Sequence, residues 1–400
     1  MKKINLLLMS LVALFMACFT ACESKYDVDH TAHIVGTWTY IGPNYAEALV
    51  IKEDGSVLST GIEDGEYWEN VAGTIKIKGN VATMTFEDGD DAIGHIDVIP
   101  GIAFSIYEED GEEWTFNYCA NDLADEVIGM WVSNEGVSGM TIQTYQEGGK
   151  SIFTGFSLGA NDYLTNMEST YKVVGNLMFQ KTGDSYFATR LTYTPNGTAV
   201  GDILSTTATM LINGNYVTST YSFLRVKESL NFTGQIYDYS AAYVSNAKGK
   251  DEDFNITGCT FNMANIKAGD FDMMFRSVLF CVEFPNATTM KQYFRPNGID
   301  GGFETPITVE GNKVTLDMSA GNPAFRKVDM YMFQSANDSQ LHVYMPTSSF
   351  INYFANLEIT TMLIEGKIDT TDTAAVEKVF ADMDARIESI NVSWVFKARN

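Results

Sequence analysis

Histidine is the side chain most often used for proton transfer and metal binding, and this chain contains only four. They are His30, His33, His95 and His342. The first two lie close to Asp27 and Asp29, so this group could bind a metal ion, but we predict a solvated tether there, which does not fix ligand geometry. The other two fall in strand-like runs, where a structural role is more common. We therefore expect no metal site and no cofactor.

Carboxylates are the other groups that could do chemistry, because a pair of them can cleave a glycosidic bond. The chain has 51 Asp and Glu residues, and dense groups fall at residues 87–91 and 108–113. A general acid needs a buried, desolvated site that raises its pKa, whereas these two groups flank predicted hairpin turns and should be solvated. Neither a P-loop nor a His-Glu-x-x-His motif occurs. We therefore predict that the protein is not an enzyme.

The cysteines do not form a recognisable framework. Of the five cysteines, two lie in the first 22 residues, and Cys119, Cys259 and Cys281 follow. Three cysteines cannot all pair with one another, and their spacing matches no zinc site. Cys259 and Cys281 flank a predicted turn at Gly269-Asp270, where a three-residue loop would set them opposite each other and allow a disulfide, whereas a two-residue loop would not. Two buried thiols are the favoured state.

The first 22 residues predict export and a lipid anchor. Two lysines precede an uncharged apolar run over residues 6–19, which is the pattern of a secretory signal and is shorter than the roughly 20 residues of a membrane span. Two cysteines lie at or just after the end of this run, each directly after an alanine. We prefer Cys22 over Cys18 as the acylated residue, because Thr20 is small and a polar run begins directly after Cys22. The alternative is an ordinary secretory peptide cleaved just before Cys22.

Charge and composition exclude several classes of partner. Without Lys2 and Lys3, 24 of the 26 basic residues remain against 51 acidic ones, which gives a net charge of −27 before lipidation. So acidic a protein is not expected to bind nucleic acid or an anionic membrane surface. Its 45% content of hydrophobic residues is ordinary for a globular chain. A length of 400 residues suggests two or three domains.

Alternation of apolar and polar residues, broken by Gly, Asn and Asp turns, predicts β-strands along most of the chain. Residues 74–78 read Thr-Ile-Lys-Ile-Lys, and Gly79-Asn80 then turns the chain into another alternating run. About eight short strands fall between residues 34 and 118, which is the number that closes a small up-and-down barrel. A second block with about eight strands follows and ends near residue 226.

We therefore predict a mainly β fold of tandem antiparallel meander barrels. A signal peptide, a tether and three domains are expected at residues 1–21, 22–33, 34–124, 125–228 and 229–400. The third domain combines strand-like runs, such as residues 254–266 and 271–284, with two inserted helices. The first helix is expected at residues 348–357, and the second after Asp372, where apolar residues recur on one face.

The spacing Gly-x-Trp opens each of the first two blocks, as Gly36-Thr37-Trp38 and as Gly129-Met130-Trp131. With the meander of hairpins that follows, it resembles the lipocalin-like domains of Bacteroidetes lipoproteins of unknown function. The resemblance implies a barrel able to hold a small apolar ligand. It also implies that the tryptophan packs at the closed barrel end, often under a basic side chain from the last strand. Trp38, Trp131 and Arg225 would take these positions, and the first block has no matching Arg or Lys.

These observations favour a non-enzymatic cell-envelope lipoprotein, anchored through Cys22 in the outer membrane, that binds a small apolar or amphipathic ligand in a β-barrel. The resemblance implies exposure at the cell surface, because acidic residues such as Glu23 and Asp27 follow the cysteine. One alternative is a surface glycan-binding accessory of a polysaccharide-utilisation system, suggested by third-block tyrosines such as Tyr331 and Tyr344. Another is a scaffold in an outer-membrane complex. The sequence does not identify the ligand-binding residues.

Overall fold

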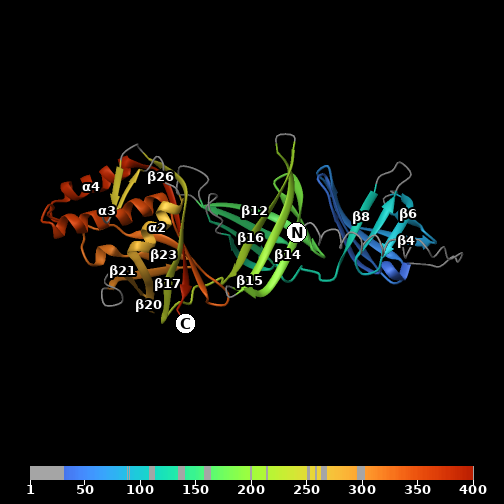
Figure 1. Cartoon of the computed structure of the whole chain (residues 1–400), viewed down its shortest axis with the longest axis horizontal. Coiled ribbons are helices and arrows are strands. Elements are labelled where there is room, and N and C mark those ends of the chain that lie inside the picture. The colour runs from blue at the N-terminus through green and yellow to red at the C-terminus, as the bar shows by residue number, and fades with distance from the viewer. Residues whose placement is uncertain are drawn as a thin grey trace, which may run out of the picture. The chain divides into compact units, whose positions relative to one another are not determined.

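Three closed, eight-stranded antiparallel barrels follow one another along the chain (Figure 1). The computed structural model describes residues 31–87, 89, 91–107, 113–133, 140–156, 164–198, 201–212, 215–249, 253–256, 259–262, 268–294 and 302–399. The predicted signal peptide, Cys18, Cys22 and His30 lie outside these residues. The mainly β fold of tandem antiparallel barrels, predicted from the alternation of side chains, is confirmed.

The first barrel is a meander in which each strand pairs with the next. Its strands are β1 (Gly36–Ile41), β2 (Tyr45–Ile51), β3 (Ser56–Glu63), β4 (Glu66–Lys78), β5 (Val81–Phe86), β6 (Asp91–Ile99), β7 (Ala103–Tyr107) and β8 (Glu113–Cys119). A short 3-10 turn, η1 (Thr31–Ile34), precedes β1. β8 pairs back onto β1, so the sheet has no free edge.

The second barrel repeats this arrangement. Its strands are β9 (Gly129–Ser133), β10 (Thr141–Gln146), β11 (Lys150–Phe156), β12 (Leu164–Val174), β13 (Leu177–Thr182), β14 (Ser185–Thr198), β15 (Gly201–Ile212) and β16 (Asn215–Val226). β9 pairs with both β10 and β16 and thereby closes the sheet. Inward-facing side chains from β9, β10, β12, β13, β14, β15 and β16 meet in one apolar core.

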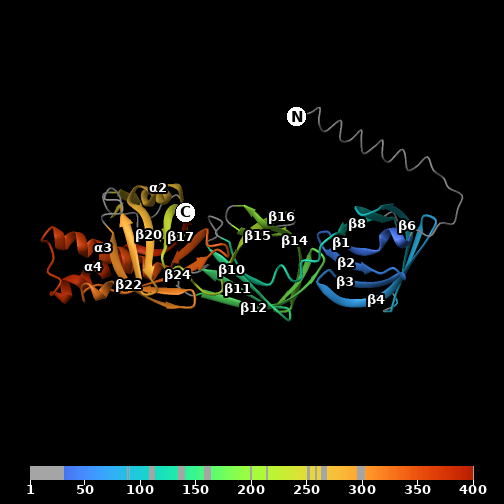
Figure 2. The ribbon, with the colours of Figure 1, turned by 90° about the horizontal axis from the view of Figure 1, so that it is seen from below.

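The third barrel is a meander with two insertions (Figure 2). Its strands are β17 (Gln235–Gly249), β20 (Leu279–Asn286), β21 (Thr289–Phe294), β22 (Phe303–Glu310), β23 (Lys313–Leu316), β24 (Val328–Gln334), β25 (Gln340–Met345) and β26 (Ile387–Ala398). Between β17 and β20 lie the hairpin strands β18 (Asp253–Ile256) and β19 (Cys259–Asn262) and the helix α2 (Ala268–Val278). Between β25 and β26 lie α3 (Thr347–Ile364) and α4 (Thr373–Arg386).

The two helices predicted near the C-terminus are present as α3 and α4, and α3 is longer than predicted. The Asp372 carboxylate caps α4, because it accepts hydrogen bonds from the backbone N–H groups of Ala374 and Ala375, each at 3.1 Å. The apolar face of α4 is buried, as its spacing predicts. Its buried residues are Val376, Phe380 and Met383.

The hairpin predicted around Gly269-Asp270 is wrong, because these residues belong to the first turn of α2. Contacts with β17 favour the helix. The Asp272 carboxylate accepts hydrogen bonds from Tyr239 Oη at 2.8 Å and from the backbone N–H of Ala242 at 2.9 Å. The strand-like run over residues 254–266 also differs from the prediction, since it contains the two short strands β18 and β19.

Without the predicted hairpin, the cross-strand geometry considered for a disulfide between Cys259 and Cys281 is not formed. Cys281 lies in β20 as a free, buried thiol. Burial raises the pKa of this thiol above its ordinary value, which favours the unreactive protonated form. The side chain of Cys259 lies outside the described part of the structure.

Trp38 and Trp131 hold equivalent positions in the first and second barrels, and both are fully buried. Each indole Nε1 donates to the carbonyl oxygen four residues earlier, that of Ile34 at 2.6 Å and that of Val127 at 2.7 Å. The glycine two residues before each tryptophan has a φ of 134° in the first barrel and 129° in the second. Only glycine adopts such values readily, so the Gly-x-Trp spacing reflects a backbone requirement at the first residue of the first strand of each barrel.

A side chain from the last strand covers each tryptophan, and it differs between the two barrels. Arg225 lies over Trp131, with its Cζ 4.5 Å from the ring centroid, and donates to two backbone carbonyl groups of the turn before β9. In the first barrel Tyr118 pairs with Trp38 in the strand register, and their ring centroids lie 5.1 Å apart. The Tyr118 ring thus occupies the position in the first barrel that the Arg225 guanidinium group occupies in the second. In the third barrel the buried Tyr237 lies near the start of the first strand.

The second and third barrels belong to one compact unit, and most of the first barrel forms another. Within the larger unit, Phe333 and Tyr344 of the third barrel pack against apolar residues of β9, β10 and β16. The backbone N–H of Lys227 also donates to the carbonyl oxygen of Gln334 at 2.8 Å. β25 is therefore buried on both faces, and His342 is 6% exposed on the face that Tyr344 shares.

We predict that His342 makes the larger unit sensitive to acid. Burial lowers the pKa of His342 from 6.5 to about 4, and its Nδ1 atom finds no hydrogen-bond partner among the described residues. Between these two pKa values the unfolded chain binds a proton that the folded chain does not. The contribution of His342 to the free energy of unfolding is therefore fully present above pH 6.5 and is lost as the pH falls toward 4. At pH 5 the loss should reach about 2 kcal/mol.

Urea unfolding of the protein and of the His342→Gln variant, each at pH 7 and pH 5, measures this effect. The variant should lose less stability than the parent between the two pH values, whatever its stability at pH 7. Equal losses in the two proteins would show that other groups, such as the many carboxylates, carry the acid sensitivity.

Candidate functional site: an apolar cavity in the third barrel

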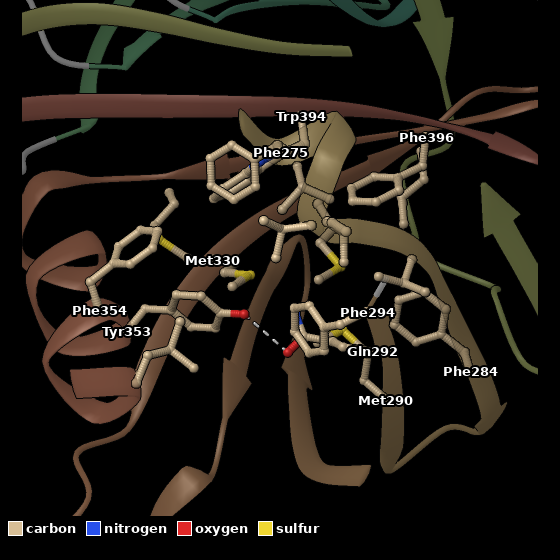
Figure 3. A pocket seen from close by; sticks show the side chains of 18 residues that line it. Phe275, Phe284, Met290, Gln292, Phe294, Met330, Tyr353, Phe354, Trp394 and Phe396 are labelled. Atoms are coloured by element: carbon tan, nitrogen blue, oxygen red, sulfur yellow. Dashed lines mark hydrogen bonds between the residues drawn. The ribbon is translucent and has the colours of Figure 1, made fainter. Parts of the chain in front are cut away.

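The interior of the third barrel contains a cavity of about 340 Å³ lined by 18 side chains (Figure 3). Alternation along the strands points one set of residues inward. On β24 this set includes Met330 and Met332, and on β26 it includes Trp394 and Phe396. β25 contributes three more inward residues. They are Leu341, Val343 and Met345.

Two helices complete the wall of the cavity. Phe275 and Val278 reach it from α2, and Tyr353, Phe354 and Leu357 reach it from α3. Phe275 connects these elements, because its ring makes an edge contact with Trp394 of β26 at 5.2 Å and with Phe354 of α3 at 6.3 Å. The two insertions of the third barrel therefore meet over the cavity that the strands enclose.

Polar groups are few in this cavity. The Tyr353 hydroxyl donates to Gln292 Oε1 at 3.2 Å, and Figure 3 shows the two side chains facing each other across the cavity. Burial raises the pKa of Tyr353 to about 12, so the hydroxyl keeps its proton at neutral pH. Because Tyr353 engages the oxygen of the Gln292 carboxamide, the NH₂ group is the donor that remains for a ligand. None of the 18 lining side chains is charged.

The composition of the wall suits a ligand of variable shape. Four of the lining residues are methionines, at positions 290, 330, 332 and 345. Methionine is unbranched and polarisable, so it fits irregular apolar surfaces and adapts to different occupants. Five phenylalanines and Trp394 supply larger, stiffer surfaces. The cavity can therefore bind an apolar body and offer it one hydrogen-bonding position, but it contains no group that could act as a nucleophile or a general base.

α2 is fixed to the barrel by a polar contact on its outer side. Besides the bonds from Tyr239 and Ala242, the Asp272 carboxylate accepts a hydrogen bond from Arg276 Nη2 at 3.1 Å. The same guanidinium group donates to the carbonyl oxygen of Ser240 at 2.6 Å. Burial and the bond to Asp272 raise the pKa of Tyr239, so this hydroxyl remains a donor. Asp272 is thus the centre of the contact that holds α2, and with it Phe275, against the cavity.

The residues singled out from the sequence lie in several places. Trp38 lies in the core of the first barrel, and Trp131 and Arg225 lie at one end of the second, so none of the three lines the cavity. His95 is exposed on β6, with Nδ1 3.2 Å from Asn80 Nδ2. Of the third-block aromatics, Tyr353 and Phe354 line the cavity, whereas Tyr331 and Tyr344 pack toward the second barrel. The recurrence of methionine at residues 330, 332 and 345 is the sequence signal that could have indicated the lumen.

We predict that Asp272→Ala loosens the packing of α2 against the barrel. The change removes the acceptor for Tyr239, Ala242 and Arg276 together, which should release α2 with its two lining residues but leave the lining residues of the strands and of α3 in place. Hydrogen exchange of the α2 amides should rise by about tenfold or more, as expected for a loss of one to two kcal/mol of local stability. Asp329→Ala, on the outer side of β24, is the matched control and should leave α2 unchanged. Unaltered exchange in Asp272→Ala would contradict this role.

Other kinds of site are not supported by the described residues. They contain no group of three or more His, Cys, Asp or Glu side chains placed to hold a metal ion, and no helix among them is long and apolar enough to cross a membrane. Residues 155–159 read Gly-Phe-Ser-Leu-Gly, the spacing of a hydrolase nucleophile elbow, and the serine of this motif lies outside the described residues. Compared with protein-family models and with curated proteins, the chain matches none of them.

Proposed function

We propose that this protein binds a small, neutral, apolar or amphipathic molecule in the cavity of the third barrel, and that it does so without catalysing a reaction. The observation that carries the proposal is a cavity of about 340 Å³ whose 18 lining side chains include no charged group. An apolar cavity of about 150 Å³ is enough to hold benzene, and ligand sites of proteins span roughly 300–1,000 Å³. The expected ligand is therefore a molecule with one or two rings, or a short chain.

The polar content of the cavity restricts the ligand further. An ionised group placed there would lose its hydration and meet no opposite charge, at a cost of several kcal/mol. A single carbonyl, ether or hydroxyl group could instead accept a hydrogen bond from the Gln292 carboxamide. A neutral ligand with one acceptor is therefore favoured over a fatty-acid anion.

The glycan-binding alternative receives little support from the third barrel. Stacking on a sugar ring requires an aromatic face that is open to solvent. Tyr293, Tyr344 and Tyr353 are each 5% exposed or less, so these tyrosines fill the interior or the contact between barrels. Tyr331 is half-buried and packs at the same contact between barrels, so packing accounts for most of the Tyr-rich composition that suggested glycan binding.

The cellular location remains a proposal based on the sequence. A basic start, a short apolar run and an Ala-Cys pair at residues 21–22 support acylation at Cys22 and an anchor in the outer membrane, as the resemblance to Bacteroidetes lipocalin-like lipoproteins implies. The strand pattern of the Gly-x-Trp blocks supports the same family.

We predict that filling the cavity abolishes the binding of a neutral probe. Prodan, a neutral two-ring naphthalene dye with one carbonyl group, should bind with enhanced fluorescence, and a dimethylaminonaphthalene sulfonate anion of similar size should bind much more weakly. Val343→Trp places a large ring inside the barrel and should reduce probe affinity by about tenfold or more. Thr308→Trp places the same ring on the exposed face of β22 and serves as the control. The proposal fails if Val343→Trp folds and binds the probe normally, or if the anion binds as well as the neutral dye.

We also predict that Cys22→Ser abolishes incorporation of a palmitate analogue in the native host and releases the protein from the membrane fraction, whereas Cys18→Ser retains both. Acylation depends on the cysteine sulfur, so serine cannot replace it. The opposite result would move the anchor to Cys18, and an unlabelled parent protein would indicate an ordinary secretory peptide.

A further inference from the structure

The lumen of the first barrel carries an unusual set of side chains at the end where β2 begins. Tyr40, Tyr45, Trp68 and Trp114 gather there and are all half-buried. The ring centroids of Tyr45 and Trp114 lie 4.7 Å apart, those of Tyr40 and Trp114 5.2 Å apart, and those of Tyr45 and Trp68 6.0 Å apart. Since half-buried rings retain some contact with solvent, these four form an accessible aromatic platform.

A buried carboxylate belongs to the same end of the lumen. Glu47 lies on the same face of β2 as Tyr45, Leu49 and Ile51, so its side chain points inward. The residue is only 6% exposed. Leu49 and Ile51 belong to the apolar core of this barrel. Glu47 therefore lies between the aromatic platform and that core.

Two hydrogen bonds run to the Glu47 carboxylate. Tyr45 Oη donates to Glu47 Oε2, and Ser59 Oγ donates to Glu47 Oε1, each at 2.5 Å. Trp68 Nε1 donates to Ser59 Oγ at 2.7 Å, which directs the single proton of that hydroxyl toward Glu47. Two members of the aromatic platform are thus connected to the carboxylate, and both Glu47 oxygens act as acceptors.

The distribution of charge in this barrel also favours a cation at this end. Residues 36–119 contain 17 Asp and Glu residues, three lysines and no arginine. The lysines are Lys52, Lys76 and Lys78. Lys52 follows the last residue of β2, and the other two lie in the last residues of β4, whereas the platform residues Tyr45 and Trp68 lie at the starts of those strands. All three lysines of the barrel therefore lie at its opposite end.

From these contacts we infer that the first barrel binds an organic ammonium cation at the platform of Tyr40, Tyr45, Trp68 and Trp114, with Glu47 as the counter-charge. Aromatic faces attract cations through their quadrupoles, and a carboxylate in a low-dielectric interior attracts positive charge over a longer range than in water. A sugar would gain only stacking on these rings, because burial obstructs direct hydrogen bonds to the carboxylate, whereas a cation also gains from its charge. A metal ion would need several oxygen ligands, whereas Glu47 supplies one carboxylate.

This site is independent of the third-barrel cavity, and its ligand is of the opposite kind. The third barrel offers no charged lining group, whereas the first offers a carboxylate beneath π faces. A failure of either proposal therefore leaves the other intact.

Titration of the purified protein with choline, followed by ligand-observed NMR or calorimetry, tests the inference. Choline should bind, and dimethylbutanol, the neutral isostere in which carbon replaces the nitrogen, should bind at least about tenfold more weakly. Choline affinity should also fall with added salt, because the attraction is electrostatic. Equal binding of the isostere, binding of glucose instead, or no binding of choline would each overturn the inference.

Three variants locate the site. Glu47→Gln keeps the shape of the side chain but removes the charge, and Trp114→Leu removes one ring of the platform; each should weaken choline binding by about tenfold. Glu53→Gln, in the turn after β2 at the opposite end of the barrel, removes a charge of the same kind and should leave the affinity unchanged. If Glu47→Gln does not fold, Trp114→Leu still decides the matter. If Glu53→Gln weakened choline binding as much as the other two variants, the effect would come from net charge alone, and the proposed site would be wrong.

Discussion

The pairing of each barrel's last strand with its first is the constraint on which the rest of this structure depends. In the first two barrels the residues that seal one end are themselves partners in this closing pair: Trp38 lies opposite Tyr118, and Trp131 lies opposite Arg225. Packing at the barrel end and strand register are thus fixed by the same contacts. Eight strands enclose a space that inward side chains can just fill, so the content of each lumen is decided by those side chains alone.

The three barrels use this freedom in different ways. The first combines an apolar core with a carboxylate and aromatic rings, and the second covers Trp131 with the Arg225 cation. In the third, the insertions that form α2 and α3 supply part of the wall, with Phe275 and Tyr353 among the lining residues. Their side chains close the lumen without filling it, because they approach from helices rather than from the strands that set the barrel width. The cavity thus arises from the insertions and the barrel together.

The sequence predicted the local features well and the distant ones poorly. Alternation of apolar and polar side chains depends on neighbouring residues, so the strands and the first two blocks of eight strands could be predicted from the sequence. The helix α4 after Asp372 could be predicted for the same reason. α2 was missed because Phe271, Met273 and Phe275 alternate like a strand, and the helix depends on Asp272 meeting Tyr239, which lies 33 residues earlier. The lumen of the third barrel was hidden because residues 341–345 are buried on both faces. Glu47 resembled any other acidic residue until the fold placed it inside a barrel.

The size of the third cavity bears on the proposal that it holds a ligand. An enclosed, empty apolar cavity destabilises a protein by roughly 24 cal/mol for each Å³; the cavity here, of about 340 Å³, is partly open, so it costs less than this relation gives, but its apolar wall still lacks part of its van der Waals contacts. Phe275 of α2 contacts Phe354 of α3 and Trp394 of β26, so these three parts of the wall are fixed relative to one another. A wall kept open by its own side-chain contacts is stable when a ligand supplies the missing van der Waals contacts. Because β25 borders both this cavity and the second barrel, ligand occupancy should stabilise the packing between the two barrels as well.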